Sequence, residues 1–142
     1  MLGSWQLWAV LSAMFAALTA IFAKIGVENV NSDLATFIRT IVVVVVLAGI
    51  LTAAGEWQPP ATIAARTYLF LLLSGLGTGA SWLCYFRALQ LGDAARVAPI
   101  DKLSVVLVAI FGAGFLGERL SAINWLGVAA IAGGAVLVAV RG

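Results

Sequence analysis

Long uncharged apolar runs alternate with short polar segments along the chain, and this alternation predicts membrane-spanning helices. The hydrocarbon core of a bilayer is roughly 30 Å thick, so about 20 apolar residues in a helix cross it. Three runs reach that length without a charged residue, and two shorter runs reach it when their helices begin a turn or more earlier. The pattern therefore predicts five spans, at about residues 3–25, 34–55, 66–90, 97–117 and 121–140.

Polar residues, glycines and prolines between these runs predict where the helices begin and end. Ser32 and Asp33 are candidate N-caps for the second span. The segment at 56–60, which contains Pro59 and Pro60, ends the second span, because proline cannot continue a helix. Pro99 falls in the first turns of the fourth span, where it is tolerated or bends the helix. Residues 117–121 form so short a connection that the last two spans should make an antiparallel hairpin.

The composition places the whole chain in a membrane. Of its 142 residues, 63% are hydrophobic and 10% are charged, against about 25% charged in a soluble domain. Too few polar residues remain to cover a soluble fold, so apolar surface must face lipid. Because backbone groups in lipid must be satisfied within their own segment, helices are expected throughout. The sequence thus predicts an all-α, multi-pass integral membrane protein forming a bundle of five transmembrane helices.

The sequence lacks the motifs that are typical of enzymes, metal sites and nucleic-acid binding. It has no histidine and a single cysteine, Cys84, inside an apolar run. No nucleotide-binding glycine loop, paired-histidine motif or nucleophile elbow occurs. Residues 75–79 are rich in glycine but fall mid-membrane, where helix packing explains them better. We expect no catalytic residues, cofactor, metal or nucleic-acid partner.

The eight basic residues divide unevenly between the two ends of the predicted helices. Six fall at the end that holds the first and third connections and the C-terminus, and two at the other end. The positive-inside rule then places the six-residue end in the cytoplasm. When only the basic residues in loops and tails are counted, three fall at the first end and two at the other. Insertion of the chain in both orientations is therefore an open alternative.

Small residues recur at steps of four on four of the spans, which predicts close helix packing in lipid. The candidate packing residues are Ala16, Ala20, Gly75, Gly79, Ala109, Ala113, Gly133 and Gly134. Lys24 continues the first of these stripes, so it should point into the bundle and can pair with Glu28. Asp101 and Lys102 lie about 100° apart on a helix, which predicts different partners for them.

Most charged residues lie towards one membrane face, and two interpretations of this stay open. They form either a charged vestibule leading to a substrate path or simple anchoring charges with helix-end ion pairs. Aromatic residues near the same face belong either to an interfacial belt or to a cavity that stacks on an organic substrate. The substrate-cavity candidates are Lys24, Arg39, Trp82, Tyr85, Asp101 and Lys102.

Several short segments together resemble the EamA family of the drug/metabolite transporter superfamily. They are YFRALQLG at 85–92, APIDKLS at 98–104, LGERL at 116–120, WLG at 125–127 and the glycine pair at 133–134. The resemblance covers the whole chain as a single EamA-like domain, residues 1–142, and is strongest in the last sixty residues. It implies half of a ten-helix inverted-repeat fold in a prokaryotic inner (plasma) membrane. The cavity of such a fold lies between its two halves.

The resemblance also implies a function and a partner. We expect a secondary transporter subunit that moves a small organic metabolite or amino acid by alternating access. A second copy, as an antiparallel homodimer, or a related subunit would complete the fold. A non-transporting structural or regulatory membrane subunit is the alternative. The small multidrug-resistance branch uses a carboxylate midway along its first helix, but residues 1–23 contain no acid. If a carboxylate couples transport here, Asp101 is the candidate.

Overall fold

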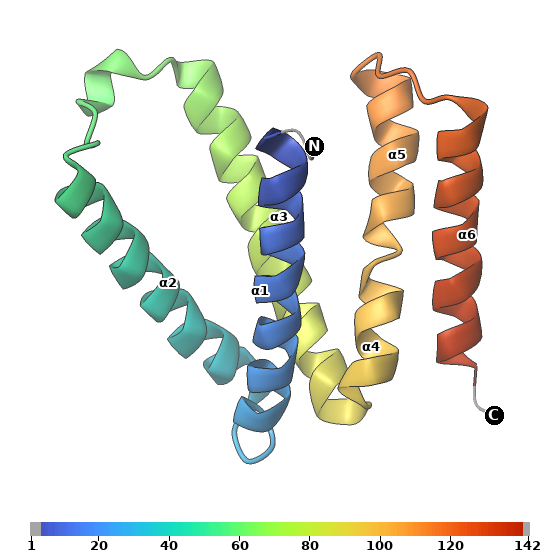
Figure 1. The fold of residues 1–142 in the computed structure, drawn as a ribbon. Coiled ribbons are helices and arrows are strands. Elements are labelled where there is room, and N and C mark those ends of the chain that lie inside the picture. Colours follow the sequence, from blue (N-terminus) through green and yellow to red (C-terminus); the bar gives the residue numbers. More distant parts are fainter. Residues whose placement is uncertain (1–3, 141–142) are drawn as a thin grey trace. The chain divides into compact units, whose positions relative to one another are not determined.

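The computed structural model describes residues 4–140, and the backbone over that range is helical with no strand. Its elements are α1 (Ser4–Gly26), α2 (Ser32–Ala54), the 3₁₀ helix η1 (Pro60–Thr62), α3 (Ala65–Leu91), α4 (Ala94–Asp101), α5 (Ser104–Phe115) and α6 (Ala122–Ala139) (Figure 1). Five helical segments in this range are long and apolar enough to cross a membrane, with α4 and α5 together making the fourth. The predicted all-α class with five spans is confirmed.

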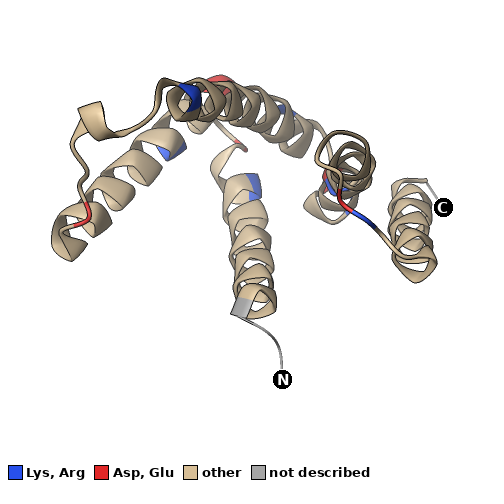
Figure 2. Cartoon of the chain, turned by 90° about the horizontal axis from the view of Figure 1, so that it is seen from above, with Lys and Arg blue, Asp and Glu red and all other residues tan. Residues whose placement is uncertain are grey.

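The outer surfaces of these helices are apolar, as a lipid-facing surface must be. At most 11% of any span is buried within the chain, and large aliphatic and aromatic side chains are exposed on every span. Charged residues occupy a few short stretches of ribbon, and most of each helix carries none (Figure 2). In lipid these apolar surfaces remain out of water, so their exposure is compatible with a stable fold.

Both ends of α2 are fixed by side-chain and backbone capping. The Asn31 side chain accepts hydrogen bonds from the backbone N–H groups of Asp33 and Leu34, at 2.9 and 3.1 Å. Asn31 is therefore the N-cap, and the prediction of Ser32 or Asp33 was wrong. At the other end Gly55 adopts a left-handed conformation with φ of 68°. The N–H of Glu56 then reaches the Leu51 carbonyl at 3.0 Å, which ends the helix before the prolines.

The fourth span is two helices rather than one, and its break lies just beyond Pro99. Proline has no N–H to donate to the carbonyl four residues earlier, which weakens the helix at this point. Leu103 donates to the Ile100 carbonyl at 2.9 Å, and Val105 donates to that of Lys102 at 3.0 Å. These i→i+3 bonds tighten the chain locally. The bend that Pro99 suggested is thus a discontinuity, with α4 ending at Asp101.

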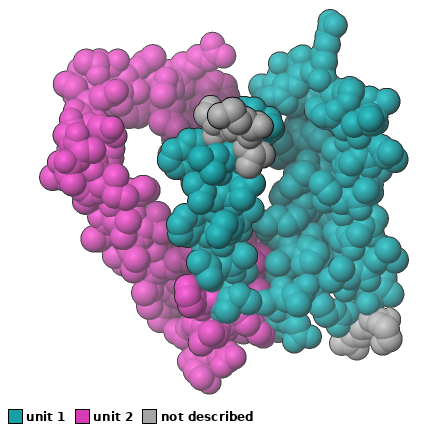
Figure 3. All heavy atoms as spheres, viewed as in Figure 1, with its two compact units in different colours: residues 1–21, 91–142 teal, residues 22–90 magenta. Residues whose placement is uncertain are grey.

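The chain divides into two compact units, coloured separately in Figure 3. Unit 1 comprises residues 1–21 and 91–142, and unit 2 comprises residues 22–90. In unit 1, α6 packs against both α4 and α5, so the predicted antiparallel hairpin is present. Arg96 of α4 donates a hydrogen bond of 2.8 Å to the carbonyl of Ala139 at the end of α6. This bond satisfies a helix-terminal carbonyl that would otherwise lack a donor.

Unit 2 has its buried core at one end, where the last turn of α1 meets the start of α2 and the end of α3. The fully buried side chains there are Val27 and Leu89, each with 0% exposure, and Ser32, with 1%. The Gln90 amide donates to the carbonyls of Val27 and Val30, at 3.2 and 2.9 Å. The turn between α1 and α2 is thereby tied to the end of α3. This junction sets the position of α2 relative to α3.

Candidate functional site

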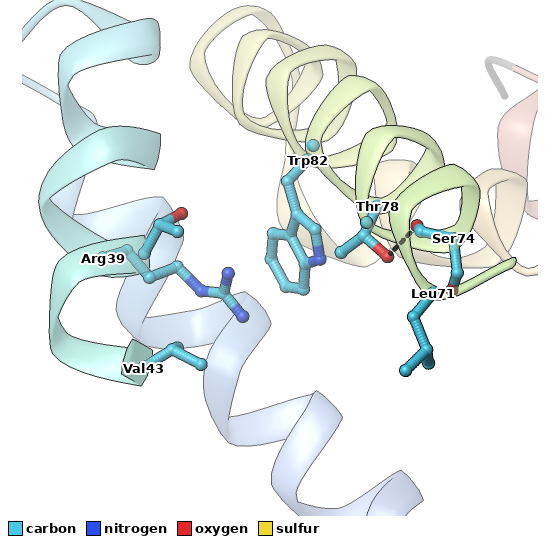
Figure 4. Close-up of a pocket in the computed structure, with 9 residues that line it drawn as sticks. Arg39, Val43, Leu71, Ser74, Thr78 and Trp82 are labelled. Carbon is cyan, nitrogen blue, oxygen red and sulfur yellow. Dashed lines mark hydrogen bonds between the residues drawn. The ribbon is translucent and has the colours of Figure 1, made fainter. Parts of the chain in front are cut away.

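A cavity of about 460 Å³ lies between α2 and α3, within unit 2 (Figure 4). Leu71 begins the α3 wall and Trp82 ends it, and the residues between them recur every three or four positions on one helix face. The lining residues are Arg39, Thr40 and Val43 from α2, and Leu71, Ser74, Gly75, Thr78, Gly79 and Trp82 from α3. Its size is within the range of small-molecule sites, which is about 300–1,000 Å³.

The Arg39 guanidinium lies over the indole ring of Trp82. The guanidinium carbon is 3.4 Å from the ring centroid, and Figure 4 shows the two groups pointing toward each other. Arg39 is seven residues into α2, or about 10 Å along the helix axis. A cation over an aromatic face gains about 0.5–2 kcal/mol. This contact holds the charge inside the span, although a long basic side chain can also extend to the interface.

The Trp82 ring is itself held by two neighbouring aromatic residues on α3. Tyr85 meets it edge-on, with centroids 5.6 Å apart and ring planes at 88°. Phe86, which is buried, packs against it at 5.7 Å. Edge-to-face contacts of this kind are favourable because of the ring quadrupole. Tyr85 therefore supports the cavity wall, while Arg39 and Trp82 form part of it.

Hydroxyl groups supply the other polar atoms of the cavity. Thr40 donates to the Thr36 carbonyl at 2.8 Å, and Thr78 donates to that of Ser74 at 2.9 Å. Each threonine oxygen keeps lone pairs that can accept a hydrogen bond. Among the described residues, the Ser74 hydroxyl has no hydrogen-bond partner. The cavity thus combines one cation with three hydroxyls, and none of its lining residues is acidic.

The remaining cavity candidates are not among the residues that line this cavity. The Lys24 ammonium donates to the Leu89 carbonyl at 2.7 Å, at the buried junction of unit 2. Asp101 and Lys102 belong to unit 1, where they form an ion pair of 3.2 Å. The prediction that these two neighbours need different partners was wrong. Lys102 follows the last residue of α4 with helical backbone angles, and its long, flexible side chain reaches back to the Asp101 carboxylate.

The small residues predicted to pack helices have different surroundings within the chain. Ala20 is buried, whereas Ala16 is exposed. Ala109 and Ala113 are half-buried, and Ala113 lies next to the buried Gly112. Side-chain carbons built at Gly75, Gly79, Gly133 or Gly134 would meet no described atom within 4 Å. Close packing at these glycines therefore remains a prediction about surfaces that this chain does not itself cover.

Sequence reasoning singled out Arg39 and Trp82 but missed most of the cavity wall. Thr40, Ser74 and Thr78 were not predicted, because hydroxyl residues are common in membrane helices. Their spacing held a signal, since Ser74, Thr78 and Trp82 recur at steps of four on α3. Within residues 4–140, no group of three or more histidine, cysteine or acidic residues could hold a metal ion.

Comparison with known proteins places the chain in a family. The model of the EamA-like transporter family matches residues 3–140. The chain belongs to that family. It is 69% identical over 137 residues to a Sinorhizobium sp. protein named as a transporter in the cobO 3' region, with 96% of this chain and 97% of that protein covered. No solved structure matched it.

A second relative of this EamA-family chain is much longer. The Bacillus subtilis protein named as the transporter YxxF is 26% identical over 142 residues. The match covers 99% of this chain but 44% of YxxF. The expected family is therefore confirmed, and the chain is a multi-pass membrane protein of a transporter family. It has about half the length of one relative and nearly the full length of the other.

Proposed function

We propose that the chain is one subunit of a secondary transporter that moves a small organic metabolite or amino acid by alternating access. The observation that carries this proposal is the cavity between α2 and α3, with Arg39 inside a membrane span. A charged residue at that depth is costly in lipid, so its presence favours a functional role. A ligand of metabolite size fits a cavity of about 460 Å³.

We further propose that a second copy of the chain, inserted in the opposite orientation, completes the transporter. Family members with inverted repeats carry their site between two halves, and this chain matches 44% of YxxF. Gly75 and Gly79 line the cavity and are exposed in the single chain, as expected for a site that a second subunit covers. A related subunit would serve the same purpose.

Transport by the purified protein tests the first proposal. The protein is reconstituted in liposomes, and counterflow is measured for radiolabelled amino acids, organic acids, organic amines and sugars. We expect at least one class to exchange faster than in protein-free liposomes. If none does, the alternative of a non-transporting structural or regulatory subunit is the better description.

A matched pair of variants on α3 links any flux to the cavity. Gly75→Leu places an isobutyl group in the cavity, whereas Gly77→Leu adds the same group at a position that does not line it. A side-chain carbon at either position meets no described atom within 4 Å. We expect Gly75→Leu to reduce flux at least 10-fold and Gly77→Leu to retain most of it. An equal loss of flux in both variants would show that transport does not depend on this cavity.

Membrane orientation tests the antiparallel dimer. A tag at each terminus is probed for access from either side of sealed inner-membrane vesicles. Antiparallel dimers require that each tag be accessible from both sides in comparable fractions of molecules. One orientation for every molecule would rule out the antiparallel arrangement.

A further inference from the structure

We propose that the cavity between α2 and α3 selects monoanionic organic carboxylates, with Arg39 as the group that binds the carboxylate. This inference rests on the proposed function, because it names the substrate class of the same site. It also narrows that function, since organic cations and neutral sugars would be excluded.

The argument begins with the electrostatics of Arg39. Among the residues that the structure describes, the Arg39 guanidinium makes no hydrogen bond or ion pair, and its contact is the ring of Trp82. None of the lining residues is acidic, so the cavity carries one uncompensated positive charge. An unpaired charge away from water is costly. An anion entering the cavity reduces that cost, and an ammonium group raises it.

The single charge of the guanidinium favours a carboxylate over a phosphate. Its planar N–H donors match the two oxygens of a carboxylate, and such pairs are often bidentate. One guanidinium neutralises one carboxylate. A phosphate monoester carries about 1.5–2 negative charges at neutral pH, so it would bring uncompensated negative charge into the span. The single charge of the cavity therefore matches a monoanion.

The other lining residues suggest how the rest of the ligand is held. Val43 and Leu71 provide apolar surface on opposite walls, which suits an aliphatic or aromatic tail. The unpartnered hydroxyl of Ser74 can donate a further hydrogen bond to an oxygen. The guanidinium already covers one face of the Trp82 ring, where an organic cation could otherwise bind. The arrangement therefore disfavours cationic drugs as substrates.

Ligand-induced thermal stabilisation of the purified protein tests this selectivity. The probes share a carbon skeleton and differ in charge: 3-phenylpropanoate, 3-phenylpropanamide and 3-phenylpropylammonium, with hexanoate, hexanamide and hexylammonium as a second set. A ligand that binds the folded state raises its Tm. We expect at least one carboxylate to bind 10-fold or more tightly than its amide, and the ammonium probes to bind no better than the amides.

Three variants assign the effect to Arg39. Arg39→Gln should lose the preference for carboxylate over amide, and Arg39→Lys, which keeps the charge without the planar fork, should retain part of it. Arg66→Gln is the matched control, because Arg66 is exposed at the start of α3 and does not line the cavity. If Arg39→Gln does not fold, the comparison of the carboxylate, amide and ammonium probes on the unaltered protein still tests the carboxylate preference.

The outcomes separate this inference from the proposed function. If no carboxylate binds more tightly than its amide, or if Arg39→Gln keeps the full preference, the inference is overturned. Flux of amines or sugars in liposomes would then leave transport intact without carboxylate selectivity. Conversely, a carboxylate preference that depends on Arg39 supports the inference even if no flux is found. The absence of flux would then contradict the proposed transport function alone.

Discussion

The junction at the end of α3 gives a prediction whose size follows from the contacts. The Gln90 amide donates to two carbonyls of the α1–α2 turn, at 3.2 and 2.9 Å. Gln90→Met keeps the length of the side chain but removes both donors. Each hydrogen bond contributes about 0.5–1.5 kcal/mol net, so the variant should lose about 1–3 kcal/mol of unfolding free energy. The upper part of that range is expected, because Val27 is fully buried.

A charge-changing variant at the same position sharpens this prediction. Gln90→Glu places a carboxylate oxygen where the amide nitrogen lies, facing the carbonyl oxygens of Val27 and Val30. Because an ionised carboxylate only accepts hydrogen bonds, this variant should lose more stability than Gln90→Met. The matched control is Gln58→Met, at an exposed position between α2 and α3, where we expect a change within about 0.5 kcal/mol.

The measurement is equilibrium unfolding in mixed micelles of a mild detergent and SDS, followed by tryptophan fluorescence and checked for reversibility. The reasoning is refuted if Gln90→Met unfolds at the same SDS fraction as the unaltered protein. It also fails if Gln90→Glu is no less stable than Gln90→Met, because the two carbonyls would then not be the partners that matter. A similar loss in Gln58→Met would point to a general effect of the substitution.

Three further predictions concern other parts of the chain. If a carboxylate couples transport to protons, Asp101→Asn should abolish the dependence of liposome transport on a pH gradient, and retained coupling would exclude this residue from that role. Arg96→Met should lower the unfolding free energy by about 1.5 kcal/mol, because the Ala139 carbonyl loses a charged donor; an unchanged unfolding curve would contradict the bond. Gly55→Ala should cost about 1–2 kcal/mol because of its left-handed backbone. Gly49→Ala, inside α2 with open space around it, should be neutral or stabilising by up to about 1 kcal/mol, and the opposite order would contradict this reasoning.

The spans could be predicted from the sequence because the bilayer imposes a single strong rule. A segment in lipid must satisfy its own backbone and remain apolar for about 20 residues. Even the valine run at 42–46, which favours strands in water, lies within α2. Helix ends were harder to predict, because capping depends on which side chain reaches back to the first N–H groups. Asn31 does this in place of its two neighbours in sequence.

The break in the fourth span was only partly predictable. Pro99 marked the weak region, but the helix ends at Asp101, and α5 begins at Ser104. Proline removes a hydrogen bond to the carbonyl one turn earlier in the chain. The position at which the helix ends depends instead on the i→i+3 hydrogen bonds that follow Pro99. Those bonds depend on backbone angles that the sequence does not specify. The ion pair of Lys102 with Asp101 was also missed, because an angular separation on a helix does not account for the reach of a long lysine side chain.

The pairing of Arg39 with Trp82 was beyond the reach of sequence reasoning. The two residues are far apart in the chain, and their contact depends on the rotation of α2 and α3 about their axes. That rotation is fixed at the buried junction, where Val27 and Leu89 have no exposed surface. The spacing of Ser74, Thr78 and Trp82 could be read from the sequence as one face of a helix. The sequence could not show that Arg39 of α2 lies opposite that face.

The two roles considered for Gly75 and Gly79 are compatible once the cavity is taken into account. As packing residues they let another helix approach closely, and as lining residues they leave space beside Arg39. A helix from a second subunit that lies across this face would cover the cavity without filling it. Larger residues at these positions would then prevent both subunit contact and ligand entry. Oligomeric state and carboxylate binding, measured together on Gly75→Leu, would show whether a loss of binding accompanies a loss of the dimer or occurs without it.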